Sequence, residues 1–264
     1  MKKDLLEKAI TAAILAGNAI LNIYEQDFAV QYKDDHSPLT EADLFAHQKI
    51  VETLGDEFPI LSEESSEIPF SERKNWKEFW LIDPLDGTKE FVKKNGEFTV
   101  NIAFIKHGNP LLGVVYVPVT KKLFWGIENQ GSFQITVEHP LTFSVNDLLA
   151  KAQSINNNQL PDTFTIVASR SHCSIETETF INDCKEKHGN THLVSAGSSL
   201  KLCMVAERKA QVYPRLAPTM EWDTAAAHAV AKYAGCKVYD FHTHQELQYN
   251  KENLLNPWFV VELS

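Results

Sequence analysis

The sequence predicts an α/β fold, α+β in its first half, with an antiparallel or mixed sheet in the first half, a parallel or mixed sheet in the second, and helices packed on the sheet faces. Three observations predict it. Successive extended segments dominate the first half, including a long hairpin pattern at residues 98–117. The second half alternates short apolar runs with helical patterns, which is typical of strands joined by crossover helices. The chain has 264 residues, 44% of them hydrophobic, and can bury a large core as one domain or two tightly joined halves.

The first helix is expected at the N-terminus. Small and apolar residues recur there at helical spacing, namely Leu6, Ala9, Ala13, Gly17, Ile20 and Tyr24. Two lysines precede this stretch, as in a signal peptide, but charged residues interrupt it at Asp4, Glu7 and Lys8. Because no uncharged apolar run of about 18 residues follows, the sequence predicts a helix packed in the core and no membrane span.

The other elements of the first half follow from apolar runs and turn residues. A second helix is expected to begin near Thr40, after the turn residues Ser37 and Pro38. The hairpin pattern predicts two long strands turned at residues 107–110. Further strands are expected at residues 28–33, 58–61, 79–82, 123–128 and 131–137.

A polar segment at residues 138–162 is the best candidate for a hinge between the halves. We therefore expect an N-terminal α+β subdomain at 1–145 and a C-terminal α/β subdomain at 146–264 that closes the site. Strands of the second half are expected at 164–168, 192–196, 211–213, 238–241 and 258–261. Its helices are expected at 175–187, 198–208 and 223–235.

Composition narrows the classes of function. The net charge is -10 and the sequence has no block of basic residues, which argues against a nucleic-acid polymer or an anionic membrane as a partner. The four cysteines lack zinc spacing and fit reduced thiols in a cytosol. P-loop, dinucleotide-binding and nucleophile-elbow patterns are absent from the sequence. A small anionic substrate stays compatible with this charge if metal ions supply the positive charge.

Residues 80–91, WLIDPLDGTKEF, are the stretch around which the candidate site is organised. A short buried strand leads into Asp83, and proline at the next position favours an extended conformation before it, so that Asp86 turns back beside Asp83. Gly87 permits a tight turn, and Thr88 places a hydroxyl at an apparent helix start. Two acids, a glycine and a hydroxyl suit hard cations and a phosphate, although a solvated turn has the same composition.

Three further acids lie where they can join this site. Glu63 ends a second apolar strand and is a better candidate ligand than Glu64, whose neighbours indicate a solvated loop. Asp223 precedes an alanine-rich helix that could approach another element closely, and N-capping alone would explain it. Asp43 lies in a first helical turn, where a surface acid is also favoured by the helix dipole.

Together the acids predict metal chemistry. Glu63, Asp83, Asp86 and Asp223 would repel one another by about 4 kcal/mol per pair at about 4 Å, at an effective dielectric constant of about 20, so cations must neutralise them. Oxygen ligands without histidine or cysteine select magnesium over zinc. Two magnesium ions would cancel four carboxylates, which indicates metal-assisted phosphoester hydrolysis with Thr88 aligning the water.

Three motifs also carry a resemblance to a known family. SEE at 62–64, DPLDGT at 83–88 and WDTAA at 222–226 resemble the signatures of the inositol monophosphatase superfamily of magnesium phosphatases. Within it the chain is most similar to bacterial CysQ-type 3'(2'),5'-bisphosphate nucleotidases, through segments 37–43, 84–91, 95–103, 169–172, 197–201 and 213–215. The resemblance implies a layered α/β/α/β/α sugar-phosphatase fold.

The resemblance also implies roles for individual residues. Glu63, Asp83 and the Leu85 carbonyl would bind a first magnesium ion, and Asp83, Asp86 and Asp223 a second, with a third ion left open. Thr88, oriented by Asp43, would polarise the attacking water, with Glu63 also acting in catalysis. The residues expected against the substrate are Glu63, Leu85, Asp86, Gly87, Thr88, His172, Ser198, Lys201, Arg215 and Asp223.

A second anion site has independent support in GSSLK at 197–201, which combines a helix start with a lysine. The alternatives are an N-cap for Ser198, a solvated helix face for Lys201 and an ordinary loop for His172.

Together with the metal site, the resemblance implies an enzyme that removes the 3'-phosphate of adenosine 3',5'-bisphosphate and could also act on its 5'-phosphosulfate. By resemblance it would serve sulfate assimilation in the cytoplasm, as a monomer or homodimer, with peripheral association with the inner membrane left open. An inositol or other sugar phosphate phosphatase is the alternative within the class. A nucleotide-sensing protein without turnover is the alternative from another class.

Overall fold

The structure is a computed structural model that describes residues 2–26, 30–32, 38–65, 68–169 and 174–263. Its larger sheet has seven strands in the order β3-β4-β5-β6-β7-β8-β9. Strands β3 and β4 pair in parallel and the other pairs are antiparallel, so the sheet is mixed. The strands are β3 (Ile60–Ser62), β4 (Glu78–Asp86), β5 (Thr99–Lys106), β6 (Asn109–Val117), β7 (Lys122–Ile127), β8 (Gly131–Thr136) and β9 (Gln153–Ser154).

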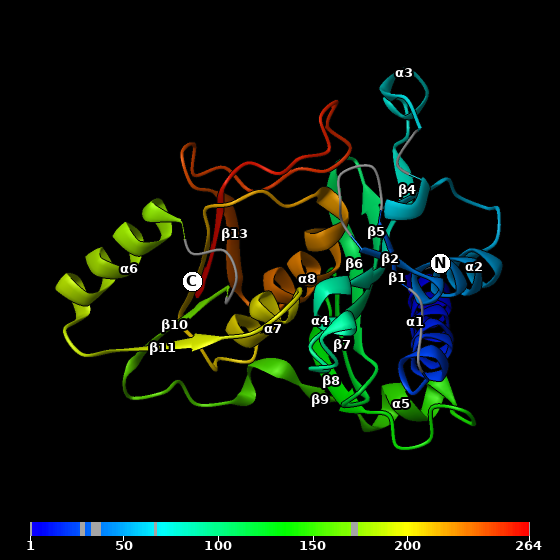
Figure 1. The fold of residues 1–264 in the computed structure, drawn as a ribbon, viewed down its shortest axis with the longest axis horizontal. Coiled ribbons are helices and arrows are strands. Elements are labelled where there is room, and N and C mark those ends of the chain that lie inside the picture. Colours follow the sequence, from blue (N-terminus) through cyan, green and yellow to red (C-terminus); the bar gives the residue numbers. More distant parts are fainter. Residues whose placement is uncertain (1, 27–29, 33–37, 66–67, 170–173, 264) are drawn as a thin grey trace.

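Two helices, α1 (Lys2–Tyr24) and α2 (Glu41–Leu54), cover one face of this sheet (Figure 1). Helix α1 is long and apolar enough to cross a membrane by length and composition, but half of its most apolar window is buried inside the protein. A Cβ atom added at Gly17 would lie 2.4 Å from the Tyr116 ring, so α1 contacts the sheet closely. The expected core helix is thereby confirmed. A two-stranded ribbon, β1 (Val30–Tyr32) with β2 (Pro38–Thr40), precedes α2.

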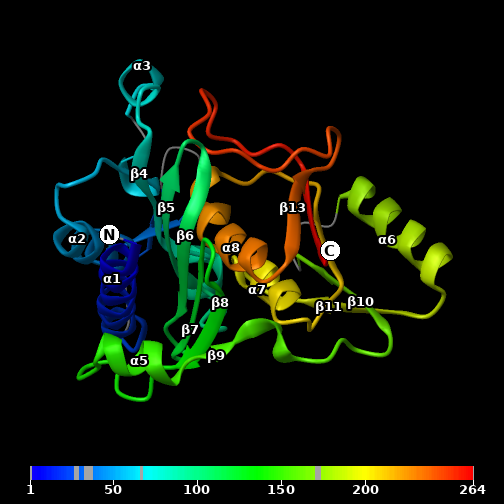
Figure 2. The same cartoon turned by 180° about the vertical axis from the view of Figure 1, so that it is seen from behind.

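The smaller sheet has five strands in the order β11-β10-β12-β14-β13. Strands β11, β10 and β12 run parallel, whereas β14 pairs antiparallel with β12 and β13, so this sheet is also mixed. The strands are β10 (Phe164–Ala168), β11 (Thr191–Ser195), β12 (Val212–Arg215), β13 (Cys236–Asp240) and β14 (Phe259–Leu263). Helix α6 (Ile175–His188) lies on the outer face of this sheet, as both ribbon views show (Figures 1 and 2).

Helices α7 (Leu200–Ala206) and α8 (Glu221–Tyr233) lie between the sheets (Figure 2). A Cβ atom at Gly113 of β6 would lie 2.2 Å from the Ala226 carbonyl oxygen, and one at Gly126 of β7 would lie 2.4 Å from that of Ala229. Glycines on the sheet and alanines on the helix therefore let α8 contact the larger sheet directly. The five-layer α/β/α/β/α arrangement is confirmed.

Some element boundaries differ from the expectation. Segment 138–162 contains a helix, α5 (Val145–Lys151), and strand β9, which joins the larger sheet. Helix α7 begins at Leu200, two residues later than expected, because Ser198 takes a left-handed φ of 52° that a helix cannot include. Two short helices, α3 (Phe70–Arg73) and α4 (Thr88–Val92), flank β4.

Candidate active site

The end of β4 carries the first two acids of the site. Its pairing with β5 shifts register between Asp83 and Asp86, so one side of the strand bulges where Pro84 and Leu85 lie. Strand β4 therefore runs through to Asp86, instead of ending near residue 82. Gly87 then turns the chain with a left-handed φ of 93° and serves as the N-cap of α4.

The start of α8 brings the third acid to the same place. Asp223 is the third residue of α8, so the expected N-cap position is wrong, and Met220 is the N-cap. The Met220 amide donates to Asp223 Oδ2 at 2.9 Å, which fixes this carboxylate from its own backbone. One carboxylate oxygen from each of Asp83, Asp86 and Asp223 lies within 4.8 Å of the others. Asp223 thus lies beside two acids that precede it in the chain by 137 residues or more.

Glu63, in a 3-10 turn (Glu63–Ser65) after β3, lines the same pocket of about 240 Å³ as these three acids. Burial, together with repulsion from Glu63, Asp86, Asp223 and Asp43, raises the pKa of Asp83 well above its ordinary value. Burial and repulsion from Asp86 likewise raise the pKa of Asp223. The acids are thus destabilised in their charged form unless cations lie among them.

The donor set fits a hard divalent cation. Every carboxylate in the pocket offers oxygen, and the described residues that line it include neither histidine nor cysteine. The Leu85 amide donates to Asp83 Oδ1 at 3.0 Å, which orients that carboxylate. The raised pKa values of Asp83 and Asp223 are also expected of acids built to be neutralised by an ion.

Thr88 lies beside the acids with Asp43 behind it. The Thr88 hydroxyl is 3.4 Å from Asp43 Oδ1 and 3.4 Å from the Leu85 carbonyl oxygen. Asp43 is only 1% exposed, so it is not the surface acid of the alternative interpretation. The structure therefore places the Thr88 hydroxyl at the edge of the acidic pocket, where the buried Asp43 carboxylate can accept a hydrogen bond from it.

Asp86 is held by residues from both halves of the chain. Its Oδ2 accepts hydrogen bonds from the Ser198 hydroxyl at 2.5 Å, from the Ser199 amide at 2.7 Å and from Asn101 Nδ2 at 3.3 Å. Ser198 thus contacts an acid of the site and is not an N-cap, since Ser199 occupies that position of α7. These bonds connect Asp86, at the end of β4, to β5 and to the segment before α7.

A second pocket, of about 140 Å³, adjoins the first and is lined by Lys201 and Arg215. Lys201 is only 5% exposed, so it does not lie on a solvated helix face. Its ammonium donates to the carbonyls of Ala196, at 3.2 Å, and Ser198, at 2.6 Å. Burial lowers the pKa of Lys201 to about 8. Arg215 Nη2 donates to the Pro218 carbonyl at 2.9 Å. His172 lies outside the described residues.

Lys89 was not singled out by sequence reasoning. It follows Thr88 in α4, is exposed and lines both pockets. Among the described residues shared by the two pockets, it is the one basic side chain. A lysine directly after the acidic turn was a usable signal, but its position between the pockets depends on the tertiary structure. Asn101 was also missed, because a buried strand gives no sign of which element faces it.

Comparisons with known proteins agree with this geometry. The model of the inositol monophosphatase family matches residues 1–258. The 3'(2'),5'-bisphosphate nucleotidase CysQ of Salmonella typhimurium is 41% identical over 265 residues, which cover 98% of this chain and all of the relative. CysQ of Haemophilus influenzae is 32% identical, with 99% of this chain and 93% of the relative covered.

Solved structures give the same result. The crystal structure of CysQ from Bacteroides thetaiotaomicron, described as a bacterial member of the inositol monophosphatase family, has a TM-score of 0.91 at 48% identity, covering 100% of this chain and 98% of that chain. The suhB protein of Bartonella henselae has a TM-score of 0.74 at 21% identity, covering 99% and 94%, and supports the fold alone. Since the family model spans nearly the whole chain and the acids of its halves meet in one pocket, the chain belongs to the inositol monophosphatase family.

Proposed function

We propose that this chain is a magnesium-dependent 3'(2'),5'-bisphosphate nucleotidase that converts adenosine 3',5'-bisphosphate to AMP. The observation that carries the proposal is the convergence of Asp83, Asp86 and Asp223 within 4.8 Å beside a second pocket lined by Lys201 and Arg215. Relatives at about 40% identity across the whole chain carry the nucleotidase name. Lys201 and Arg215 beside the acidic pocket suit a substrate that carries a second phosphate.

Metal binding falls to the acids in this proposal. Glu63, Asp83 and the Leu85 carbonyl would hold one magnesium ion, and Asp83, Asp86 and Asp223 would hold a second. The bound ions supply a polarised water and charge stabilisation for the leaving oxygen. The amide hydrogen bonds to Asp83 and Asp223 keep these carboxylates in place, so little reorganisation is needed when the ions bind.

The remaining residues orient water and substrate. The Thr88 hydroxyl donates its hydrogen bond to the buried Asp43 carboxylate, and its oxygen accepts a hydrogen bond from the attacking water. Backbone amides of Gly87 and Thr88 face the transferred phosphate. Ser198 orients Asp86, while Lys201 and Arg215 bind the nucleoside and the phosphate that is retained, a role that the resemblance also implies for His172. Cation pairing with a phosphate is a strong, charge-assisted interaction.

A division of labour between the halves follows. The first half, 1–145, supplies Asp43, Glu63, Asp83 and Asp86, whereas the second half, 146–264, adds Asp223, Lys201 and Arg215. We extend the proposal to the cytoplasm as the site of action and to sulfate assimilation as the pathway served. A monomer or a homodimer is compatible with one complete site per chain.

The test is phosphate release from a panel of substrates at saturating magnesium. Adenosine 3',5'-bisphosphate should be hydrolysed with the largest kcat/KM, ahead of inositol 1-phosphate, fructose 1,6-bisphosphate and NADP. A chelator should abolish phosphate release. Faster hydrolysis of inositol 1-phosphate would favour the sugar phosphatase alternative, and binding without release would favour a sensor.

A further inference from the structure

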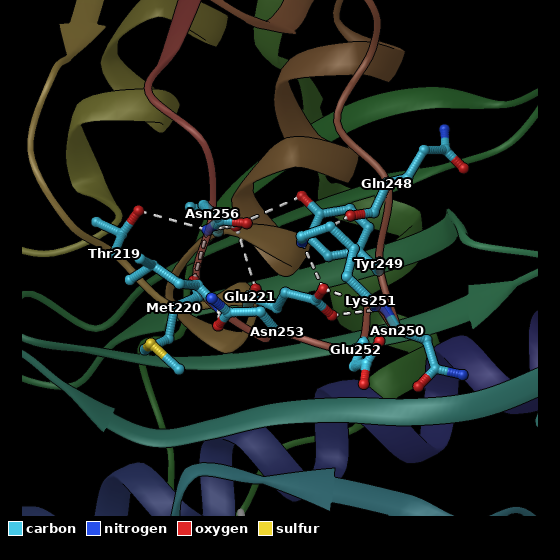
Figure 3. Close-up of polar contacts among 12 residues, drawn as sticks. Thr219, Met220, Glu221, Gln248, Tyr249, Asn250, Lys251, Glu252, Asn253 and Asn256 are labelled. Carbon is cyan, nitrogen blue, oxygen red and sulfur yellow. Dashed lines mark hydrogen bonds and ion pairs between the residues drawn. The ribbon is translucent and has the colours of Figure 1, made fainter. Parts of the chain in front are cut away.

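A buried glutamate without a role in the proposed chemistry lies two residues before Asp223. Glu221, the first residue of α8, is 0% exposed. Its Oε2 accepts a hydrogen bond from the Asn250 amide at 2.6 Å, and its Oε1 accepts one from the Lys251 amide at 3.0 Å. The Lys251 ammonium also donates to Glu221 Oε1, and Figure 3 shows this group of contacts around the start of α8. A lysine and two backbone amides of one loop segment thus stabilise the charge of this buried carboxylate.

The same loop segment is held from its other side by a buried arginine of the first half. Arg73, at the end of α3, is 3% exposed. Its Nη1 donates to Asn250 Oδ1 at 2.9 Å and to the Lys251 carbonyl at 2.6 Å, and its Nη2 donates to the Glu252 carbonyl at 2.8 Å. Asn250 Nδ2 returns a bond to the Arg73 carbonyl at 2.7 Å. We call these five residues, Arg73, Glu221, Asn250, Lys251 and Glu252, the Arg73–Glu221 network.

A third anchor reaches the N-cap of α8. Asn256 Nδ2 donates to the Met220 carbonyl at 2.7 Å and to Thr224 Oγ1 at 3.0 Å (Figure 3). The Glu221 amide donates to the Leu254 carbonyl at 2.9 Å. The Met220 amide meanwhile binds Asp223 Oδ2. The first turn of α8, which carries Asp223, is therefore fixed by hydrogen bonds with the loop.

We propose that the Arg73–Glu221 network positions Asp223 for metal binding, so that Glu221 and Arg73 set the affinity of the site for its divalent cation. The inference rests on the metal site of the proposed function. Glu221 acts through the backbone of α8 and does not bind the ion, so it is a positioning residue. Outer residues that orient metal ligands typically change metal affinity by about 10- to 100-fold when they are removed.

The test compares Glu221→Gln with a matched control, Glu207→Gln. Glu207 is also buried, at 3% exposed, and pairs with Lys122 and Lys209 at the end of α7. Both variants lose a buried ion pair and should lower the melting temperature. Only E221Q should raise the Mg²⁺ concentration for half-maximal activity, by about tenfold. Its KM for adenosine 3',5'-bisphosphate at saturating Mg²⁺ should stay within about twofold of wild type.

Direct metal titration separates this inference from the proposed function. Mn²⁺ binding, followed by calorimetry without substrate, should weaken in E221Q and not in E207Q. Arg73→Gln and Lys251→Met should weaken Mn²⁺ binding in the same direction, and they provide the test if E221Q does not fold. Metal affinities for E221Q, R73Q and K251M equal to that of E207Q would overturn the inference. Normal Mn²⁺ binding by wild type without nucleotidase activity would instead overturn the proposed function alone.

Discussion

Asp83 and Glu221 are both buried carboxylates, and they differ in what neutralises them. Burial raises the pKa of each. Around Asp83 the further causes are repulsions, from Glu63, Asp86 and Asp223. Around Glu221 they are attractions, from the Lys251 ammonium and from the amides of the loop. The negative charge around Asp83 is therefore not compensated by nearby cations, whereas that of Glu221 is paired with a lysine of the protein itself.

The contrast between Asp83 and Glu221 shows how a metal-binding carboxylate can be distinguished from a structural one. Burial alone does not identify a ligand, because Glu221 is as buried as Asp83. The distinguishing feature is mutual repulsion: the neighbouring carboxylates raise the pKa of Asp83, and the Leu85 amide orients it without adding a positive charge. A structural carboxylate carries its own cation, as Glu221 carries Lys251.

The largest expected effect is on catalysis. Asp83→Asn should lower kcat/KM for adenosine 3',5'-bisphosphate by about a thousandfold, because loss of a shared metal ligand removes about 4 kcal/mol of charge stabilisation. Steady-state phosphate release measures this. Glu207→Gln is the matched control with a buried acid far from the pocket, and it should keep kcat/KM near the wild-type value. If D83N kept more than about a tenth of the wild-type kcat/KM, Asp83 would not be an essential metal ligand.

The two acids should have opposite effects on stability without metal. In a chelator, D83N should raise the melting temperature by about 2 °C or more, because it removes repulsion worth about 1 kcal/mol. E221Q should lower it by about 4 °C, since Lys251 loses its partner, a cost of about 2 kcal/mol. Calorimetric melting curves measure both. Shifts of the same sign would show that the two carboxylates are equivalent.

The pH dependence of stability sharpens the same contrast. The pKa of Asp83 in the folded, metal-free chain is raised above its ordinary value of 3.8, so protonation favours the folded state. The free energy of unfolding should therefore fall as the pH rises from about 4 through the folded pKa. Magnesium should restore stability most at the higher pH. A magnesium-induced rise in melting temperature that is equal at pH 5 and pH 7.5 would contradict the acidic cluster.

Lys89 tests whether the two pockets act as one substrate site. Lys89→Met should raise the KM for adenosine 3',5'-bisphosphate about fivefold, equivalent to about 1 kcal/mol, and leave that for a monophosphate near the wild-type value. Lys93→Met is the matched control, because Lys93 is exposed at the C-cap of the same short helix and is not among the described residues lining either pocket. Equal effects of K89M and K93M would assign Lys89 to the solvated surface.

The smallest expected effect concerns Lys201. Since burial lowers its pKa to about 8, its ammonium loses the proton as the pH rises from 7 to 9. The KM for the bisphosphate should then rise about threefold, and that for a monophosphate should rise less. Lys201→Arg keeps its charge over this range and should flatten the profile. An unchanged pH profile in K201R would remove Lys201 from substrate binding.

Much of the fold could be predicted because its elements are set by local patterns. The hairpin at 98–117 and strand 164–168 agree with β5, β6 and β10 to within a residue or two. Alternation of strands and helices in the second half predicted a parallel or mixed sheet, and the antiparallel strand β14 makes it mixed. Small residues in α8 indicated a close approach, but the sequence held no sign that Gly113 and Gly126 would be the partners.

The acids of the site were visible as carboxylates at strand and helix ends, while their support was not. Ser198 bonds Asp86 only because its backbone adopts a left-handed φ of 52°, which its sequence does not demand. Arg73 meets Asn250 across a separation of 177 residues, and a single arginine in a polar stretch reads as a surface charge. Contacts of this kind arise from tertiary packing and have no local pattern.

The central claim is that acids from both halves enclose divalent cations. A crystal soaked in Mn²⁺ and measured for anomalous scattering tests it most directly. We expect strong anomalous density among the carboxylates of Asp83, Asp86 and Asp223, and loss of that density in Asp223→Asn. Absence of density at this pocket under saturating Mn²⁺, with ordered carboxylates, would contradict it.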